Sequence, residues 1–120
     1  MAKISLETIV KQLGLEIVVG KELLKKEVSG CYCGDLLSDV MANSKEGDLW
    51  ITIQTHQNIV AVAVLKEHSG IIIAGGKEPD PETIEKAQKE GICILRANQN
   101  AFEISGMLYE ILKGIKDEGD

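Results

Sequence analysis

The segment from Gly70 to Thr83 constrains the fold of this chain more strongly than any other part. It begins with an apolar run that contains three isoleucines, continues with Gly75 and Gly76, and reaches an Asp-Pro step at Pro81. Short apolar runs are typical of strands buried in a parallel sheet, and proline is common in the first turn of a helix. The segment therefore predicts a strand, a tight glycine turn and a helix. Such a unit places backbone N–H groups at the carboxyl edge of a sheet, where α/β proteins bind ligands.

The remaining sequence predicts further strands and helices in alternation. We expect strands over residues 15–19, 29–34, 49–55 and 92–95, and helices over residues 6–13, 35–42, 81–90 and from 101 onward. Residues 58–67 are apolar and β-branched, which by propensity favours a strand. We interpret them as a buried helix, because Asn58 can cap the segment and its length suits a helix. The alternation predicts an α/β domain, a three-layer α/β/α arrangement around a mostly parallel sheet.

Helix starts are predicted from side chains that can cap them. Ser5, Asn58 and Asp80 each precede an expected helix, and Asn100 with Glu103 forms a variant of the capping box. These side chains accept hydrogen bonds from backbone N–H groups that have no partner inside the helix. The caps therefore support the helix boundaries given above.

Two segments carry more specific expectations. In the short helix over residues 35–42, we expect Leu36, Leu37 and Val40 to face the core. In the strand over residues 49–55, side chains alternate between two faces, and Trp50 lies on the more polar one. Two interpretations of Trp50 stay open: an interface residue, since tryptophan is enriched at interface hot spots, or a side chain packed under a covering helix.

Composition and charge exclude several classes of protein. The 120 residues suit one domain, and the formal net charge of −6, with lysines scattered among glutamates, argues against a nucleic-acid partner. No apolar run is long enough to span a membrane, and a polar residue stands where a signal peptide would be apolar. Three cysteines argue against a disulfide framework. We therefore expect a cytoplasmic protein without a membrane or nucleic-acid partner.

The loops that follow the strands hold the candidate ligand-binding residues. In a parallel sheet these loops emerge at one edge, so the side chains and amides that they carry lie close together. Glycine amides and a lysine ammonium supply positive potential, which suits a small anionic metabolite or a nucleotide. The candidate residues are Thr55, His56, Asn58, Gly75, Gly76, Lys77 and Asn98.

The same residues also fit a purely structural interpretation. Gly75 and Gly76 can form a tight turn without a ligand, and Asn58 can be only a helix cap. Gly-Gly-Lys lacks the complete P-loop pattern, including the hydroxyl that would hold magnesium. No cofactor is expected from these residues.

Cys31 and Cys33 open an alternative, a small metal- or thiol-dependent redox protein. Residues two apart on a strand share a face, so both thiols could meet a metal together with His56. Structural zinc normally needs four Cys or His ligands at characteristic spacings, and a lone Cys-x-Cys pair is more often core packing. Asp35 and Asp39, one helical turn apart, could form an acidic patch or an ordinary solvated face. No nucleophilic triad is recognisable, so we expect no catalytic residues and no metal site.

From about Gly30 to Leu112, the chain resembles the DRTGG domain family. The resemblance rests on the loop after the strand near Ile51, the strand that ends in Gly75-Gly76, and the proline-initiated helix. The Asp-Arg pair of the family is replaced by Thr55-His56, and its Thr-Gly-Gly by Ala74-Gly75-Gly76. A contact made by that Asp-Arg pair is therefore not carried over to this chain.

The resemblance implies a fold similar to the N-terminal domain of HPr kinase/phosphorylase, in a single domain over residues 1–120. Residues 1–28 would hold an N-terminal helix and strand, residues 29–113 the core, and residues 114–120 an acidic tail. It also implies a stand-alone, non-catalytic regulatory module, commonly a homodimer, that binds a small ligand or docks a kinase-like or metabolic enzyme.

Overall fold

The computed structural model describes residues 3–119, with side chains as far as Gly114. A five-stranded sheet runs through the centre, with strand order β2-β7-β6-β5-β4. Strands β4 to β7 are parallel to one another, and β2 joins β7 antiparallel at one edge. The sheet is therefore mostly parallel, as predicted. Its strands are β2 (Glu16–Val19), β4 (Gly30–Cys33), β5 (Asp48–Thr52), β6 (Gly70–Ile73) and β7 (Ile94–Arg96).

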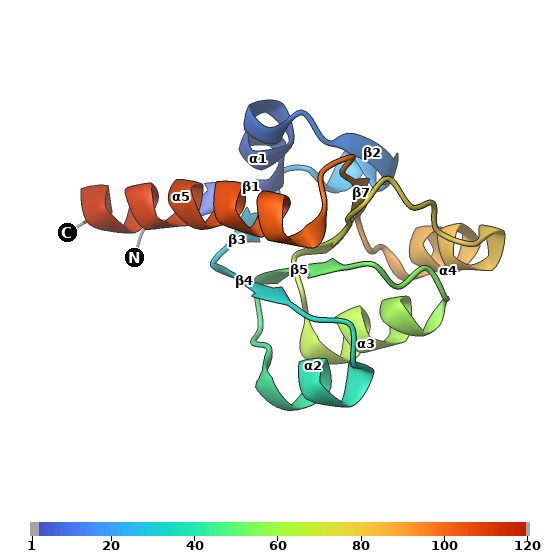
Figure 1. The fold of residues 1–120 in the computed structure, drawn as a ribbon. Coiled ribbons are helices and arrows are strands. Elements are labelled where there is room, and N and C mark those ends of the chain that lie inside the picture. The colour runs from blue at the N-terminus through green and yellow to red at the C-terminus, as the bar shows by residue number, and fades with distance from the viewer. Residues whose placement is uncertain (1–2, 120) are drawn as a thin grey trace.

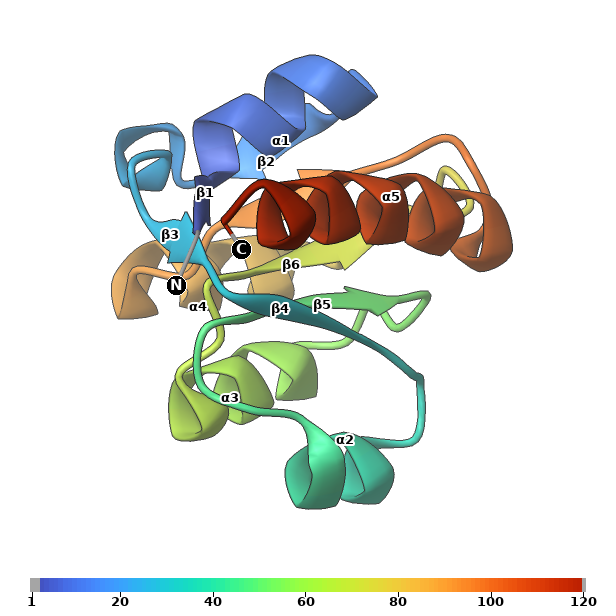
Figure 2. The same ribbon diagram turned by 90° about the vertical axis from the view of Figure 1, so that its left-hand side faces the viewer.

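Two layers of helices cover the sheet (Figures 1 and 2). The connections β4-α2-β5, β5-α3-β6 and β6-α4-β7 all step to the neighbouring strand in the same direction. Because such crossovers are right-handed, they place their three helices on one face of the sheet. The first and last helices cover the opposite face, which gives the predicted three-layer α/β/α fold. The helices are α1 (Leu6–Leu13), α2 (Leu37–Asn43), α3 (Asn58–Lys66), α4 (Pro81–Glu90) and α5 (Ala101–Gly119).

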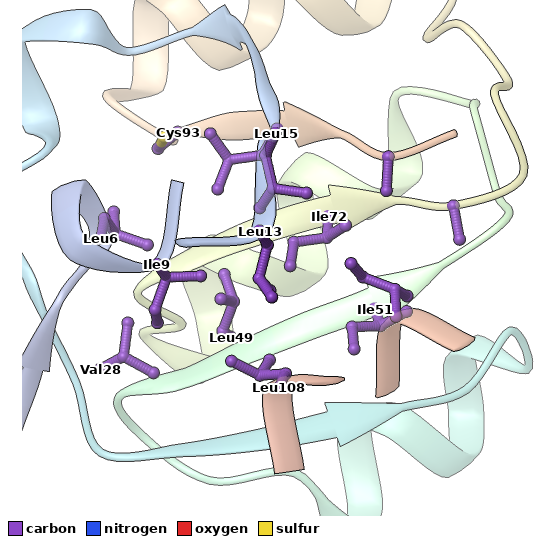
Figure 3. Close-up of a cluster of buried hydrophobic side chains, with 14 of the residues drawn as sticks. Leu6, Ile9, Leu13, Leu15, Val28, Leu49, Ile51, Ile72, Cys93 and Leu108 are labelled. Carbon is purple, nitrogen blue, oxygen red and sulfur yellow. The ribbon is translucent and has the colours of Figure 1, made fainter. Parts of the chain in front are cut away.

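Each face of the sheet has its own aliphatic core. Figure 3 shows the cluster on the α1 and α5 side, where Leu49 and Ile51 of β5 and Ile72 of β6 meet both helices. The intervening residues, Trp50 and Ile71, point to the cluster beneath α2, α3 and α4. All five residues of β5 are buried. Burial on both faces explains why residues 49–51 and 71–73 are consecutive apolar residues that do not alternate with polar ones.

The segment over residues 58–67 is a helix, as predicted against its strand propensity, but its cap differs. The N-cap position is Gln57, and the N–H of Asn58 donates to His56 Nδ1 at 3.1 Å. The histidine ring therefore accepts a hydrogen bond from the first turn of the helix, and the expectation that Asn58 caps the helix is wrong. Asp80 occupies an N-cap position but makes no side-chain capping bond. Ser5 and the Asn100–Glu103 pair cap α1 and α5 as expected.

Other expectations are corrected by the structure. Leu36 is 69% exposed, because it precedes the first residue of α2 and points away from the core. Ile53 is also exposed, since β5 ends at Thr52. A two-stranded sheet of β1 (Ile4–Ser5) and β3 (Glu27–Val28) was not predicted, because strands of two residues leave no periodic signal. Helix α5 continues to Gly119, while the side chains after Gly114, including those of the expected acidic tail, lie outside the described residues.

Trp50 is fully buried, which excludes the interpretation as an interface residue. Its ring lies in the cluster beneath α2 and α3, and its Nε1–H donates to the Gly34 carbonyl at 2.8 Å. The packing thus satisfies the polar group that burial would otherwise leave without a partner. The tryptophan ties the loop after β4 to the centre of the sheet.

Over residues 3–119, no helix combines the length and the apolar character that a membrane span requires.

Candidate functional site

The loops at the carboxyl ends of β4, β5 and β6 surround an open depression of about 530 Å³. Two of the predicted ligand-binding residues, Thr55 and Lys77, line it. The lining is mixed in character, with one apolar side chain, two carboxylates, one amide, one hydroxyl and one ammonium group. The lining residues are Asp35, Ile53, Gln54, Thr55, Lys77 and Glu78.

Gly75 and Gly76 shape the loop after β6, but their amides are already used. The N–H of Gly75 donates to the Gln99 carbonyl at 2.7 Å, and that of Gly76 to the Ala97 carbonyl at 2.8 Å. The expected cradle of free amides for an anion is therefore not formed by these two residues. Their φ angles are +74° and +69°, a region that side chains with a Cβ rarely adopt. Two consecutive glycines allow the loop to turn back toward β7.

The other predicted residues lie around the depression without lining it. His56 is exposed, and its ring accepts from the backbone of Asn58, which is also exposed. Asn98 is exposed and lies beside the glycine loop, with Oδ1 3.8 Å from the position that a Cβ on Gly76 would take. The seven predicted residues therefore share one edge of the sheet, but only Thr55 and Lys77 reach the depression.

Asp35 anchors one wall of the depression. Its Oδ1 accepts from Thr52 Oγ1 at 2.8 Å and from the N–H of Ile53 at 2.9 Å, and its carbonyl accepts from Gln54 Nε2 at 3.0 Å. The possibility of an acidic patch with Asp39 is not supported, because Asp39 bonds separately to the Tyr32 hydroxyl. Asp35 precedes α2, so the two carboxylates do not share one helix face. Gln54 was not predicted, because the sequence placed it within the expected strand over residues 49–55, whereas β5 ends at Thr52.

Arg96, the last residue of β7, holds the glycine loop in place. Its Nη2 donates to the Gly76 carbonyl at 2.9 Å and its Nε to the Lys77 carbonyl at 3.2 Å. Its Nη1 lies 2.7 Å from Glu16 Oε1 on β2, and Nη2 lies 3.7 Å from Glu78 Oε1. The planar guanidinium suits this set of divergent acceptors. Arg96 was missed, because one arginine at a strand end carries no motif.

The cysteines do not assemble a reactive centre. Burial, with smaller contributions from Cys33 and Asp48, raises the pKa of the Cys31 thiol to about 12. Burial likewise raises the pKa of Cys93 to about 11. Thiols with raised pKa values hold little thiolate at neutral pH and are poor nucleophiles and metal ligands. Among the described residues, no three Cys, His, Asp or Glu side chains lie close enough together to hold a metal ion.

His68 is buried at the opposite end of the sheet, just before β6. Ser44 Oγ donates to the Val40 carbonyl at 2.6 Å, so it accepts from His68 Nε2 at 2.8 Å. The ring is thus the Nε2–H tautomer, and Nδ1 is buried without a hydrogen-bond partner. Burial lowers the pKa of His68; Asp48 opposes this shift and Lys66 adds to it. A proton on Nδ1 would have no acceptor, so the folded state keeps the ring neutral.

The stability of the protein should therefore fall as the pH is lowered through 6.5. In this window the unfolded state binds a proton at His68 that the folded state does not, so the free energy of unfolding decreases with each added increment of acid. Urea unfolding at pH 7.5, 6.5 and 5.5 measures the effect. His68→Gln should remove most of the dependence. A pH dependence in His68→Gln equal to that of the wild type would contradict this assignment.

Comparisons with known proteins agree with this architecture. The family model of the DRTGG domain matches residues 8–111. A solved structure, the CBS and DRTGG domains of the regulatory region of Clostridium perfringens pyrophosphatase complexed with its activator, diadenosine tetraphosphate, superimposes with a TM-score of 0.67 at 24% sequence identity. The match covers 84% of this chain and 44% of that one. None of the curated proteins matches the chain. Because the family model spans most of its length, the chain belongs to the DRTGG domain family.

Proposed function

We propose that this protein is a non-catalytic regulatory module, a homodimer that binds a nucleotide or a phosphorylated metabolite in the depression lined by Thr55 and Lys77. The observation that carries the proposal is the depression itself, at the carboxyl edge of a parallel sheet, lined on one side by Asp35 and on another by the glycine loop that Arg96 holds. This edge is the usual ligand site of α/β sheets. The DRTGG neighbour belongs to a regulatory region, which agrees with a role in control rather than turnover.

The chemistry of the lining favours a ligand with two different ends. Lys77 supplies positive charge for a phosphate, while the carboxylates of Asp35 and Glu78 would repel one. Those carboxylates suit hydroxyl or amino donors, such as the ribose and base of a nucleotide. Ile53, 41% exposed, offers apolar surface beside them. A nucleotide fits this arrangement better than an inorganic anion, because the amides of Gly75 and Gly76 are engaged elsewhere.

The activator bound by the Clostridium perfringens protein does not identify the ligand of this protein. That structure contains CBS domains as well as a DRTGG domain, and this chain corresponds to less than half of it. The proposal of a nucleotide ligand therefore rests on the depression of this protein, and diadenosine tetraphosphate is one probe among several.

A thermal-shift screen tests the proposal, with AMP, ATP, diadenosine tetraphosphate, adenosine and inorganic phosphate as probes. A nucleotide at 100 times its dissociation constant should stabilise the fold by about 2.7 kcal/mol, a rise of several degrees. Lys77→Met should weaken binding by about 10- to 100-fold, the loss of one charge-assisted hydrogen bond. Lys11→Met, on the exposed side of α1, removes the same charge elsewhere and should bind as the wild type does.

Two outcomes would contradict the proposed ligand class. If inorganic phosphate stabilises the protein as much as the nucleotides do, the carboxylates of Asp35 and Glu78 take no part in ligand recognition. If none of the probes shifts the melting temperature, the regulatory role would depend on docking to a partner enzyme instead.

A further inference from the structure

Hydrogen bonds hold the carboxylate of Asp35 in one orientation at the side of the depression. Its Oδ1 accepts from the Thr52 hydroxyl at 2.8 Å and from the N–H of Ile53 at 2.9 Å. The Thr52 oxygen in turn accepts from the N–H of Gln54 at 3.2 Å, which leaves the hydroxyl hydrogen for Asp35. Among the described residues, no group donates to the second oxygen, Oδ2. Asp35 Oδ2 is therefore the acceptor that this carboxylate offers to a ligand.

The side-chain amide of Gln54 is oriented in the same sense. Its Nε2 donates to the Asp35 carbonyl at 3.0 Å, and a carbonyl oxygen only accepts, so the nitrogen and not the oxygen of the amide takes that position. The amide oxygen, Oε1, is left for a ligand. Both residues line the depression. Its Asp35 side thus presents two acceptors, one of them charged.

The common nucleobases differ in what they bring to such a pair of acceptors. The edge of guanine that pairs with cytosine carries the N1–H beside the N2 amino group, and one carboxylate oxygen can accept from both. Adenine carries an amino group beside N1, and cytosine one beside N3. Both of these ring nitrogens are acceptors and would face the carboxylate without a proton. Uracil has a single N–H between two carbonyls. Only guanine brings adjacent donors.

We propose that the depression selects guanine nucleotides, with the N1–H and the N2 amino group of the base donating to Asp35 Oδ2 and Gln54 Oε1. This inference rests on the proposed nucleotide site and names the base that it recognises. Hydrogen bonds from a base to a carboxylate are charge-assisted, and so they are stronger than those between neutral groups. Ile53, held beside Asp35 through its N–H and 41% exposed, supplies apolar surface for the face of the base.

The opposite side of the depression is left for the phosphate. Lys77 lies on the loop after β6, and Asp35 lies on the loop after β4, with β5 between the two strands. Two strand spacings separate these loops by about 10 Å, a distance that a mononucleotide bridges from base to phosphate. The volume of about 530 Å³ also lies within the range of pockets that hold small ligands.

Isothermal titration calorimetry of the full chain with GMP, IMP, XMP and AMP tests the base. These four ligands share the purine, ribose and phosphate and differ only at the edge that would meet Asp35. GMP should bind about 10- to 100-fold more tightly than AMP, the discrimination expected from a base held by two hydrogen bonds. IMP keeps the N1–H but lacks the amino group, so its affinity should lie between these two. XMP, whose C2 carbonyl would face the carboxylate, should bind no more tightly than AMP.

Asp35→Asn should change the order of the four ligands. The donors from Thr52 and Ile53 require an acceptor, so the amide oxygen should take the place of Oδ1 and the amide nitrogen that of Oδ2. GMP should then bind at least about 10-fold more weakly, and XMP more tightly, because its C2 carbonyl accepts from the amide. A disturbed fold would weaken all four ligands alike. Glu90→Gln, the control, removes the same charge at the exposed end of α4 and should keep the wild-type order.

The other outcomes separate this inference from the nucleotide site on which it rests. Equal affinities for GMP and AMP would overturn the choice of guanine and leave the nucleotide site standing. A preference for GMP that persists unchanged in Asp35→Asn would exclude Asp35 as the group that reads the base. If none of the four ligands binds the wild type, the nucleotide site falls together with this inference. The wild-type order needs no variant, so it decides the choice of base even if Asp35→Asn does not fold.

Discussion

Trp50→Ala is expected to lower the free energy of unfolding by about 3–5 kcal/mol, the usual cost of removing a large buried aromatic side chain. The ring is completely inaccessible to solvent and packs beneath α2 and α3. The substitution also leaves the Gly34 carbonyl without its donor. Together these losses should lower the melting temperature by more than about 10 °C. Urea and thermal unfolding, followed by circular dichroism, measure both quantities.

Trp50→Phe separates packing from hydrogen bonding. Phenylalanine keeps most of the apolar volume but cannot donate to Gly34, so its cost should be a fraction of that for alanine. A loss below about 1 kcal/mol in Trp50→Ala would mean that the helices collapse onto the vacated space, and would contradict the close packing seen here.

Arg96→Met is expected to lower the free energy of unfolding by about 2–3 kcal/mol. The substitution keeps an apolar stem but removes the hydrogen bonds to the carbonyls of Gly76 and Lys77, and hydrogen bonds from charged groups contribute about 1.5–3 kcal/mol. The ion pair with Glu16 adds little, because the glutamate is mostly exposed. The loop that bears Lys77 should also become less ordered, so the affinity for the ligand should fall together with the free energy of unfolding.

Hydrogen exchange is the readout that distinguishes a local from a general effect. The amides of Gly75 and Gly76 should exchange faster in Arg96→Met, whereas the N–H of Ala74, which bonds to the Thr52 carbonyl, should stay protected. Glu16→Gln serves as the control, since it removes only the exposed ion pair and should cost less than about 1 kcal/mol. Equal exchange in wild type and Arg96→Met would show that the glycine turn holds its shape without the arginine.

In the candidate site, some features could be predicted from local sequence and others could not. The glycine loop was located correctly because paired glycines after an apolar strand have few alternatives, and Lys77 follows directly. The pairing of the glycine amides was not predictable, since their acceptors, Ala97 and Gln99, belong to the loop after another strand. Arg96 and Gln54 were missed for the same reason, because their partners lie far along the chain.

What the sequence determined by itself is the order and type of the main elements, the Ser5 and Asn100 caps, and the layered α/β/α fold. Periodicity, turn residues and right-handed crossovers are local or nearly local rules, so one sequence suffices to apply them. Only the tertiary structure decided that Trp50 is buried, that Leu36 is exposed, that Asp35 lines the depression and that Arg96 holds the glycine loop beside it. Those facts depend on which distant segments meet, because burial and hydrogen-bond partners are properties of the packed chain and not of any single segment.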